Sequence, residues 1–260
     1  MLPLIILAGP TTSKKSDTAI ALAEKLDAEI IGADSMQVYK YFDIGTAKAS
    51  IDDRARIPHH LIDILEPDEE FTAFDFKTRA LEHIRELIGR GKTPVITGGT
   101  GLYLKVLRDD YDCAVQIDPG IQKQVQLEIS ERGLPLMHEE LQRIDPVSAE
   151  RILPEDTQRI ERAVSVYRQT GKALSEFVAT NPVPEYEFPI HTFIIERDRK
   201  ELYDNINLRV DHMMQEGWVD EVKGILARGF SKSLKPFQSI GYSQIVDFLD
   251  DKLSMEQAVN

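Results

Sequence analysis

The chain has 260 residues, of which 42% are hydrophobic and 29% charged, which is typical of a soluble globular protein with one large domain or a domain carrying an insertion. Its one cysteine, Cys113, excludes a disulfide framework and a cysteine-based zinc site, and it suits a reducing cytoplasm. The net charge of −13 weakly opposes nucleic-acid binding, because a protein that grips phosphates usually presents a basic face.

The first predicted strand is the apolar run at 4–8, which is too short to cross a membrane. No basic region precedes it, so we expect no signal peptide. The run leads into Gly9-Pro-Thr-Thr-Ser-Lys-Lys-Ser16, and helical spacing of apolar residues follows from Asp17 to Leu26. Such a loop directs backbone N–H groups and a helix dipole at an anion. It therefore predicts a phosphate-binding site, with an ordinary strand-to-helix turn as the alternative.

The loop meets the pattern G-x-x-x-x-G-K-[ST] except at the sixth place, where Lys14 replaces glycine. Lys15 supplies positive charge, and the Ser16 hydroxyl can bind Mg²⁺. Glycine usually serves at the sixth place because the backbone there is awkward for a side chain and passes close to the phosphate. In a left-handed conformation Lys14 costs on the order of 1–2 kcal/mol. It could also crowd the ligand, or swing outward and add a second cation.

Further strands are predicted at 29–32 and 94–97, with a helix from Thr72 to Gly89 between them. This alternation predicts an α/β fold: a parallel sheet with helices on both faces, which binds ligands at the carboxyl ends of its strands. Three of these ends carry polar or glycine-rich loops: 9–16, 34–37 and 97–101. We therefore expect the loops to converge on one site.

Two side chains at these ends are candidates for chemistry. Asp34 follows the second strand, where a carboxylate can bind Mg²⁺ or accept a proton, although a helix N-cap is the alternative. Thr100 lies in a Gly-Gly-Thr-Gly turn, where the lack of side chains lets a phosphate or a base approach the backbone. A plain tight turn without a ligand is the alternative. For His59 and His60 a structural role is favoured over metal binding, because no further His or Cys stands at metal spacing.

Strand signals are missing from about 118 to 182, where helical periodicity takes over. We therefore predict an all-helical subdomain at 116–184, inserted into a core formed by 1–115 and 185–260. The core resumes with a strand at 190–195 and with helices at 199–215 and 219–227.

Basic residues gather in the insertion. Arg159 and Arg162 are three apart and share a helix face, with Arg168 and Lys172 further along. They are candidate contacts for a nucleic-acid backbone. A solvated helix face beside Glu161 is the alternative.

Several segments together resemble the tRNA dimethylallyltransferases, in the family's order and over nearly the whole chain. They are Gly9–Ser16, Gly32–Tyr39, Asp43–Lys48, Pro58–Asp63, Gly98–Tyr103, Gln158–Arg162 with Tyr167, Thr170–Lys172 and Ile240–Tyr242. The resemblance implies a P-loop NTPase-like core and transfer of a dimethylallyl group from dimethylallyl diphosphate to N6 of an adenosine beside the tRNA anticodon, with release of diphosphate. It also implies Mg²⁺ as cofactor, tRNA and dimethylallyl diphosphate as partners, no membrane and a cytoplasmic monomer.

The resemblance assigns roles to individual residues. Asp34 accepts the N6 proton, and Thr100 and Arg209 contact the diphosphate; these three are the expected catalytic residues. The other diphosphate-binding residues, of which Ser16 also binds the metal, are Gly9, Pro10, Thr11, Thr12, Ser13, Lys14, Lys15 and Ser16. The residues expected to face the tRNA are Asp34, Ser35, Met36, Gln37, Gln158, Arg159, Ile160, Glu161 and Arg162.

Two departures from the family's pattern bear on activity. Lys14 leads us to expect weaker dimethylallyl-diphosphate binding than glycine would give. Family members usually continue for several tens of residues with a basic stretch, which bears on the strength of tRNA binding. Three other functions stay open: an adenylate isopentenyltransferase acting on free AMP, a P-loop kinase or ATPase, and a homologue that binds without turnover.

Overall fold

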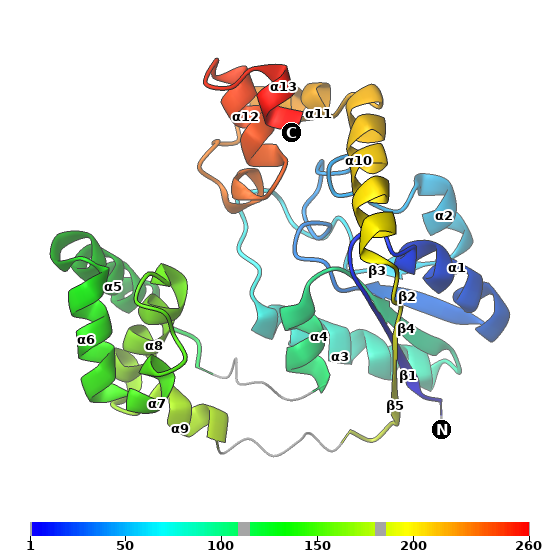
Figure 1. Ribbon diagram of the computed structural model, residues 1–260. Coiled ribbons are helices and arrows are strands. Elements are labelled where there is room, and N and C mark those ends of the chain that lie inside the picture. The colour runs from blue at the N-terminus through cyan, green and yellow to red at the C-terminus, as the bar shows by residue number, and fades with distance from the viewer. Residues whose placement is uncertain (1, 109–114, 180–185, 260) are drawn as a thin grey trace. The chain divides into compact units, whose positions relative to one another are not determined.

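The computed structural model describes residues 2–108, 115–179 and 186–259 (Figure 1). The chain divides into a sheet unit, Met1–Leu104 with Tyr186–Asn260, and a helical unit, Lys105–Glu185. Cys113 lies outside the described residues. Within the described stretches no helix is long and apolar enough to span a membrane. The assignment of catalysis to one part and tRNA contact to the other stays a prediction.

The sheet unit contains five parallel strands in the order β3-β2-β4-β1-β5. They are β1 Leu4–Ala8, β2 Ala28–Gly32, β3 His59–His60, β4 Thr93–Thr97 and β5 Ile190–Ile194. Val95 on β4 is paired with Ile5 on β1 and with Ile30 on β2, so the most apolar segments lie at the centre. The predicted parallel sheet is confirmed. The additional strand, β3, has two residues and is too short to give an apolar pattern.

The three central strands β1, β2 and β4 are buried on both faces, as is usual in parallel sheets, whereas the edge strand β5 is largely exposed. The helices of this unit are α1 Lys15–Leu26, α2 Ile51–Arg56, α3 Ala73–Gly89, α4 Gly101–Arg108 (which continues into the helical unit), α10 Arg199–Gln215, α11 Trp218–Ala227, α12 Tyr242–Leu249 and α13 Met255–Val259, with the 3₁₀ helix η1 Lys235–Gln238. On one face, α1 packs Ile20 against Ile5 and Ile30. Neighbouring strand residues point to the other face, where Ile6 and Ile31 are also buried.

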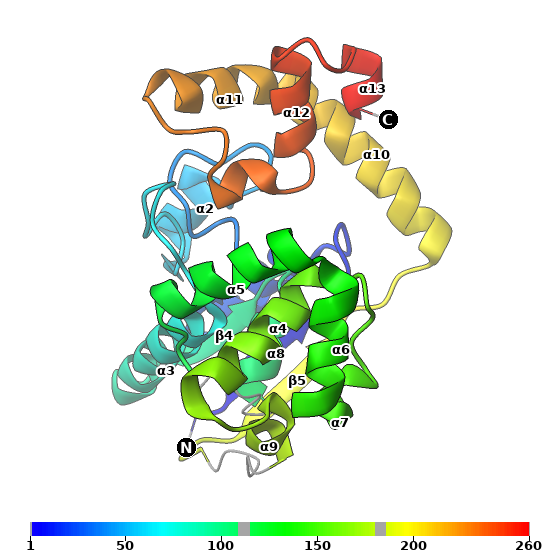
Figure 2. The same ribbon diagram turned by 90° about the vertical axis from the view of Figure 1, so that its left-hand side faces the viewer.

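The helical unit is described by five helices, and no strand occurs among its described residues. They are α5 Pro119–Arg132, α6 Leu134–Ile144, α7 Pro146–Ala149, α8 Thr157–Thr170 and α9 Leu174–Ala179. Figure 2 shows α5 and α6 lying along α8. They enclose a separate apolar core that includes Met137, Leu141 and Ile160. A core of its own is what an inserted subdomain requires.

Gly98 marks a close approach of two strand ends at the carboxyl edge of the sheet. A Cβ atom on Gly98 would lie 2.1 Å from the carbonyl oxygen and 2.2 Å from the carbonyl carbon of Ala33. The same backbone is fixed by hydrogen bonds, because the Ala33 N–H donates to Thr97 O at 2.8 Å and the Thr100 N–H donates to Ala33 O at 3.1 Å. The glycine is thus required by neighbouring backbone, whatever ligand approaches the turn.

The Gly98→Ala substitution is expected to lower the free energy of unfolding by about 1–3 kcal/mol, because fixed backbone cannot make room for the methyl group. Gly89→Ala is the matched control: nothing lies within 4 Å of its Cβ position, and removing a glycine near a helix end is expected to be neutral or to stabilise by up to about 1 kcal/mol. Urea-denaturation midpoints of both variants test this. Equal midpoints for the two variants would contradict the assignment.

Candidate functional site

The predicted phosphate-binding loop joins β1 to α1. At its start Gly9 has φ 153°, and a Cβ atom there would lie 2.7 Å from the carbonyl oxygen of Ile195. At its end Lys14 is the N-terminal cap residue of α1, with φ 64° and ψ 30°. Lys14 therefore has the left-handed conformation for which the sequence analysis expected strain, at a position that favours glycine. The first turn of α1 leaves backbone N–H groups directed toward the loop.

Lys15 begins α1, and its side chain folds back on the loop. Its Nζ donates to Gly9 O at 2.8 Å and to Pro10 O at 2.5 Å. The pKa of Lys15 is lowered, first by burial and then by the positive charge of Arg209, against the opposing attraction of Asp34. The ammonium group is thus half-buried and already in contact with the loop that it is predicted to serve.

Arg209 reaches the same region from α10, more than one hundred and ninety residues along the chain. Burial lowers the pKa of its guanidinium, and the charge of Asp34 opposes that shift. Lys15, Arg209 and Asp34 therefore lie close enough to interact electrostatically. Two cations facing one carboxylate make this region a suitable place for a further anion.

These three side chains line one cavity of about 380 Å³ in the sheet unit. Its other walls come from the three strand ends that the sequence singled out and from the loop that follows Gln37. The remaining lining residues are Thr11, Thr12, Ser13, Lys14, Ser16, Asp17, Ile30, Gly32, Gln37, Thr46, Ala47, Ala49, His59, Ile62, Thr97, Gly98 and Gly99. The convergence expected from a parallel sheet is thus observed.

Some buried hydroxyls in this cavity have no hydrogen-bond partner among the residues that the structure describes. They are Ser13 Oγ in the loop and Thr97 Oγ1 at the end of β4. An unpaired buried hydroxyl is costly, so both groups are suited to meet a polar ligand. Thr97 was not singled out from the sequence, because a lone threonine at a strand end carries no distinctive pattern.

Asp34 and Thr100 shape the second and third strand ends. Asp34 Oδ1 accepts from the Met36 N–H at 2.9 Å and the Gln37 N–H at 3.3 Å, which closes a turn. In the described stretch 2–108 no helix begins between Asp34 and α2, so the alternative role of a helix N-cap is wrong. Asp34 Oδ2 lies beside Gly99, 3.3 Å from where a Cβ would stand. The Thr100 hydroxyl accepts from the Ser35 N–H at 2.8 Å and so ties the two loops together.

Some predicted residues lie outside the cavity lining. Ser35, Met36 and Thr100 belong to the adjoining loops, and Gly9 and Pro10 to the loop that Lys15 contacts. The segment Asp43–Lys48 supplies Thr46 and Ala47 to the lining. The sequence resemblance includes this segment but implies no role for it. His59 also lines the cavity, and burial lowers its pKa while its Nδ1 lies 2.7 Å from Ile57 O.

The candidate tRNA residues of the helical unit lie on α8. Arg159 is 72% exposed and pairs with Asp156, which caps the helix. Arg162 donates from Nη2 to Val115 O at 2.7 Å. Ile160 is fully buried in the core of the unit, so its expected tRNA contact is corrected: its side chain serves packing. Glu161 accepts hydrogen bonds from two glutamines of α5.

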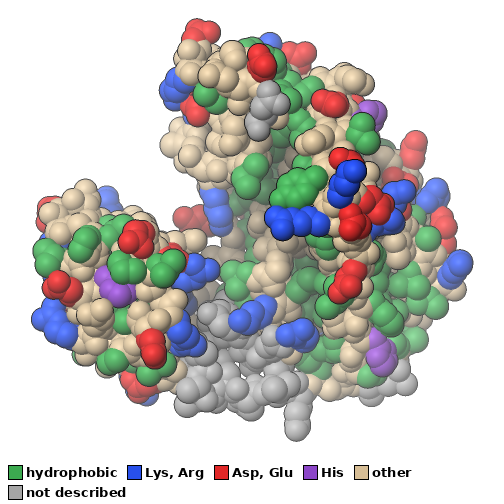
Figure 3. Space-filling view, in the orientation of Figure 1, with side chains coloured by type: hydrophobic (Ala, Val, Ile, Leu, Met, Phe, Trp, Pro, Cys, Tyr) green, Lys and Arg blue, Asp and Glu red, His purple; other side chains and the backbone are tan. Residues whose placement is uncertain are grey.

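Charges elsewhere in the molecule are mixed. Arg168 is bonded to Glu128 and Glu140, which supports a structural role for that part of the α8 face. On the face seen in Figure 3, acidic and basic side chains intermingle over α10. This mixing fits the net charge of −13.

Comparisons with known proteins point to one family. The family model described as IPP transferase matches residues 37–260. The tRNA dimethylallyltransferase of Alkaliphilus oremlandii (strain OhILAs) is 42% identical over 258 residues, which cover 99% of this chain and 82% of that protein. The tRNA dimethylallyltransferase of Syntrophobacter fumaroxidans is 44% identical over 259 residues, which cover 100% of this chain and 76% of that protein.

Solved structures are similar over the same length. The tRNA delta(2)-isopentenylpyrophosphate transferase of Staphylococcus epidermidis is 40% identical, with a TM-score of 0.68, and the match covers 100% of this chain and 84% of that one. A eukaryotic dimethylallyltransferase acting on tRNA is 28% identical, with a TM-score of 0.81, and covers 100% of this chain and 65% of that one. The similarity therefore includes both units of the chain.

The Lys14→Gly substitution is expected to raise the free energy of unfolding by about 1 kcal/mol, because it relieves a left-handed conformation. Lys25→Gly, in the last turn of the same helix, is the matched control and is expected to lower it by about 1 kcal/mol. Thermal and urea unfolding of both variants provide the measurement. If Lys14→Gly destabilised the protein as much as Lys25→Gly, the strain at Lys14 would be refuted.

Proposed function

The chain belongs to the tRNA dimethylallyltransferase (IPP transferase) family, and on that basis we propose that it transfers a dimethylallyl group from dimethylallyl diphosphate to N6 of an adenosine beside the anticodon of a tRNA. The observation that carries the proposal is the meeting of Lys15, Arg209 and Asp34 in one cavity beside the loop. This meeting supports the proposal, because the two cations suit a leaving diphosphate and the carboxylate suits a proton.

The donor binds through its diphosphate. Lys15, Arg209 and the backbone N–H groups at the start of α1 stabilise the negative charge that grows as the C–O bond breaks. Half-burial strengthens these interactions, because less water screens them. Lys14 lines the same cavity and has a left-handed backbone, so Lys14→Gly is also expected to bind dimethylallyl diphosphate more tightly.

The residues on the donor side fit Mg²⁺. They offer hard oxygen donors, namely the Ser16 hydroxyl and the unpartnered Thr97 hydroxyl, which line the cavity together. Among the described residues no group of three His, Cys, Asp or Glu side chains could hold a metal ion alone, so diphosphate oxygens would complete the site. We assign Ser16 as the protein ligand. Bound Mg²⁺ supplies charge neutralisation for the leaving diphosphate.

Asp34 serves the acceptor. The N6 amine forms a bond to C1 of the dimethylallyl group, the electron pair of the C1–O bond leaves with diphosphate, and the N6 proton passes to Asp34. An aromatic amine is a weak nucleophile, so a positioned base contributes to the rate. The hydrogen bonds from Met36 and Gln37 hold Asp34 Oδ1, which orients the carboxylate for this task.

For the helical unit we propose contact with the tRNA through Gln158, Arg159 and Arg162. The pair of Arg159 with Asp156 is exposed, and an exposed ion pair contributes little stability. A phosphate can therefore replace the carboxylate at small cost. The monomeric state and cytoplasmic location expected from the sequence stay predictions.

One incubation tests the function against its alternatives. The purified protein with Mg²⁺ and dimethylallyl diphosphate receives unmodified tRNA or AMP, and a separate sample receives ATP alone. We expect prenylated tRNA, identified by mass spectrometry of the digested nucleosides. Prenylated AMP would indicate the free-nucleotide enzyme, ADP release a kinase or ATPase, and donor binding without product a protein that has lost turnover.

The Asp34→Asn substitution is expected to lower kcat by about 10²–10⁴-fold, the usual contribution of a general base. Donor affinity should be kept or improved, because a negative charge near the diphosphate is removed. The control is Asp52→Asn, the same change on exposed α2 outside the cavity. Single-turnover rates and calorimetric Kd values measure both. An unchanged rate for Asp34→Asn would exclude Asp34 as the base.

A further inference from the structure

The loop Asp43–Lys48 forms a wall of the cavity and holds a residue predicted to face the tRNA. Thr46 and Ala47 line the cavity together with Gln37. The side-chain amide of Gln37 donates from Nε2 to Thr46 O at 3.0 Å and to Ala47 O at 3.4 Å. The position of the Gln37 side chain is therefore set by the backbone of this loop.

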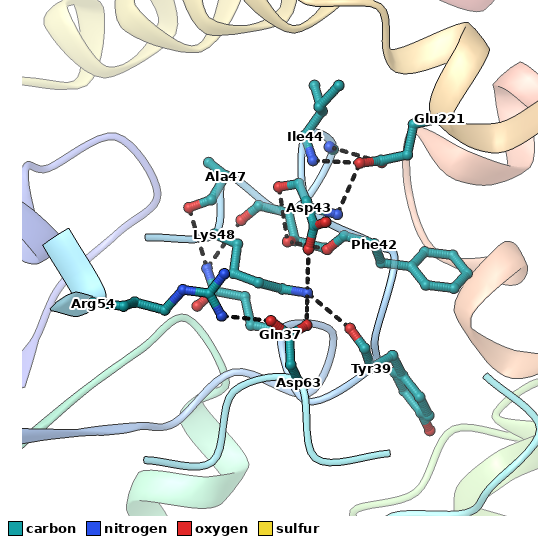
Figure 4. A network of polar contacts seen from close by, with 12 residues as sticks. Gln37, Tyr39, Phe42, Asp43, Ile44, Ala47, Lys48, Arg54, Asp63 and Glu221 are labelled. Atoms are coloured by element: carbon teal, nitrogen blue, oxygen red, sulfur yellow. Dashed lines mark hydrogen bonds and ion pairs between the residues drawn. The ribbon is translucent and has the colours of Figure 1, made fainter. Parts of the chain in front are cut away.

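A carboxylate from another part of the sheet unit holds the start of the loop. Glu221 on α11 accepts through Oε2 from the N–H groups of Asp43 at 2.9 Å and Ile44 at 2.6 Å (Figure 4). Its Oε1 accepts from the Gly45 N–H at 3.4 Å and from the Tyr242 hydroxyl at 2.6 Å. Donors converge on both oxygens, an arrangement that only an anionic acceptor satisfies fully.

Packing beside Glu221 leaves the loop little freedom. Trp218, one turn earlier on α11, lies against two glycines. A Cβ atom on Gly45 would stand 2.1 Å from the indole, and one on Gly241 would stand 2.2 Å from it. The indole is nearly buried, at 6% exposed. The C-terminal helices thus meet the loop at a close and specific contact.

A second set of contacts holds the loop from within. The Lys48 side chain is 2% exposed, and its Nζ donates to Asp43 and Asp63 at 2.6 Å each and to Tyr39 O at 2.8 Å. Arg54 completes the network by pairing with Asp63 at 2.5 Å (Figure 4). These contacts do not involve Glu221. The loop should therefore stay folded when Glu221 is changed, while its N–H groups at 43–45 lose their acceptor.

We propose that Glu221 is a positioning residue for the acceptor: it fixes the loop that holds the Gln37 amide, and so it controls the tRNA side of the cavity without touching either substrate. The role rests on the proposed function. It acts on one substrate only, because Lys15 and the phosphate-binding loop make none of the contacts described for Glu221. A residue that merely stabilised the fold would affect both substrates alike.

The test is Glu221→Gln, which keeps the size of the side chain and removes its charge. We expect kcat/KM for tRNA to fall about tenfold, as when hydrogen bonds to a charged group are lost. The Kd for dimethylallyl diphosphate should stay within about twofold. The matched control, Asp220→Asn on the same helix, has a side chain that is 81% exposed and pairs only weakly with Lys223, so it should leave both values unchanged.

A double variant tests whether Glu221 acts through Gln37. Gln37→Ala combined with Glu221→Gln should be no worse than Gln37→Ala alone, because both remove the same placement. If the losses in kcat/KM caused by the two single substitutions multiplied in the double variant, the proposal would be overturned. It would also be overturned if Glu221→Gln weakened donor binding as much as it lowered kcat/KM for tRNA, or if it left kcat/KM for tRNA unchanged. If Glu221→Gln does not fold, Tyr242→Phe removes one donor from the same carboxylate and should lower kcat/KM for tRNA about two- to threefold.

Hydrogen exchange supplies a readout that needs no reaction. The amides at 43–45 should exchange about tenfold faster in Glu221→Gln than in the wild type and unchanged in Asp220→Asn. Unchanged exchange in Glu221→Gln would show that Glu221 does not anchor the loop. If the wild-type protein modified no tRNA, both the proposed function and the role of Glu221 in that function would be overturned. The hydrogen-exchange result decides separately whether Glu221 anchors the loop.

Discussion

The half-buried positive charge of Lys15 and Arg209 is the constraint on which the site in the sheet unit depends. Burial lowers the pKa of both side chains, and the proximity of Arg209 lowers that of Lys15 further. Cations held in this way are unfavourable unless negative charge lies near them, and Asp34 supplies part of it. A bound diphosphate would supply the rest. Burying these cations destabilises the unliganded protein, and a bound anion relieves that cost, which favours anion binding.

The parallel sheet makes this concentration of charge possible. Its strands end at one edge, so loops far apart in sequence share a cavity. Close backbone approaches at Gly9 and Gly98 bring the edges together, at the carbonyls of Ile195 and Ala33. Lys14 has a left-handed conformation in this loop, where glycine is usual, at a cost in conformational strain.

The C-terminal helices complete the site from outside the sheet. Helix α10 brings Arg209 to the cavity, and Glu221 on α11 holds the loop that supplies Thr46 and Ala47 to the lining. Both Arg209 and Glu221 come from positions after the helical unit in the chain. The insertion does not interrupt the cavity, because every residue that lines the cavity belongs to the sheet unit.

The sequence by itself determined the parallel sheet, its main strands, the all-helical character of the insertion, the family and the loop with its lysine, because apolar periodicity and local motifs are written in neighbouring residues. It could not place β3, whose two residues carry no pattern, nor separate buried Ile160 from exposed Arg159 in one motif. Tertiary structure alone decided the pairing of Glu221 with the 43–45 amides and the unpartnered hydroxyl of Thr97. Burial and long-range hydrogen bonds depend on which distant segments come into contact in the folded chain. A local sequence pattern does not predict those contacts.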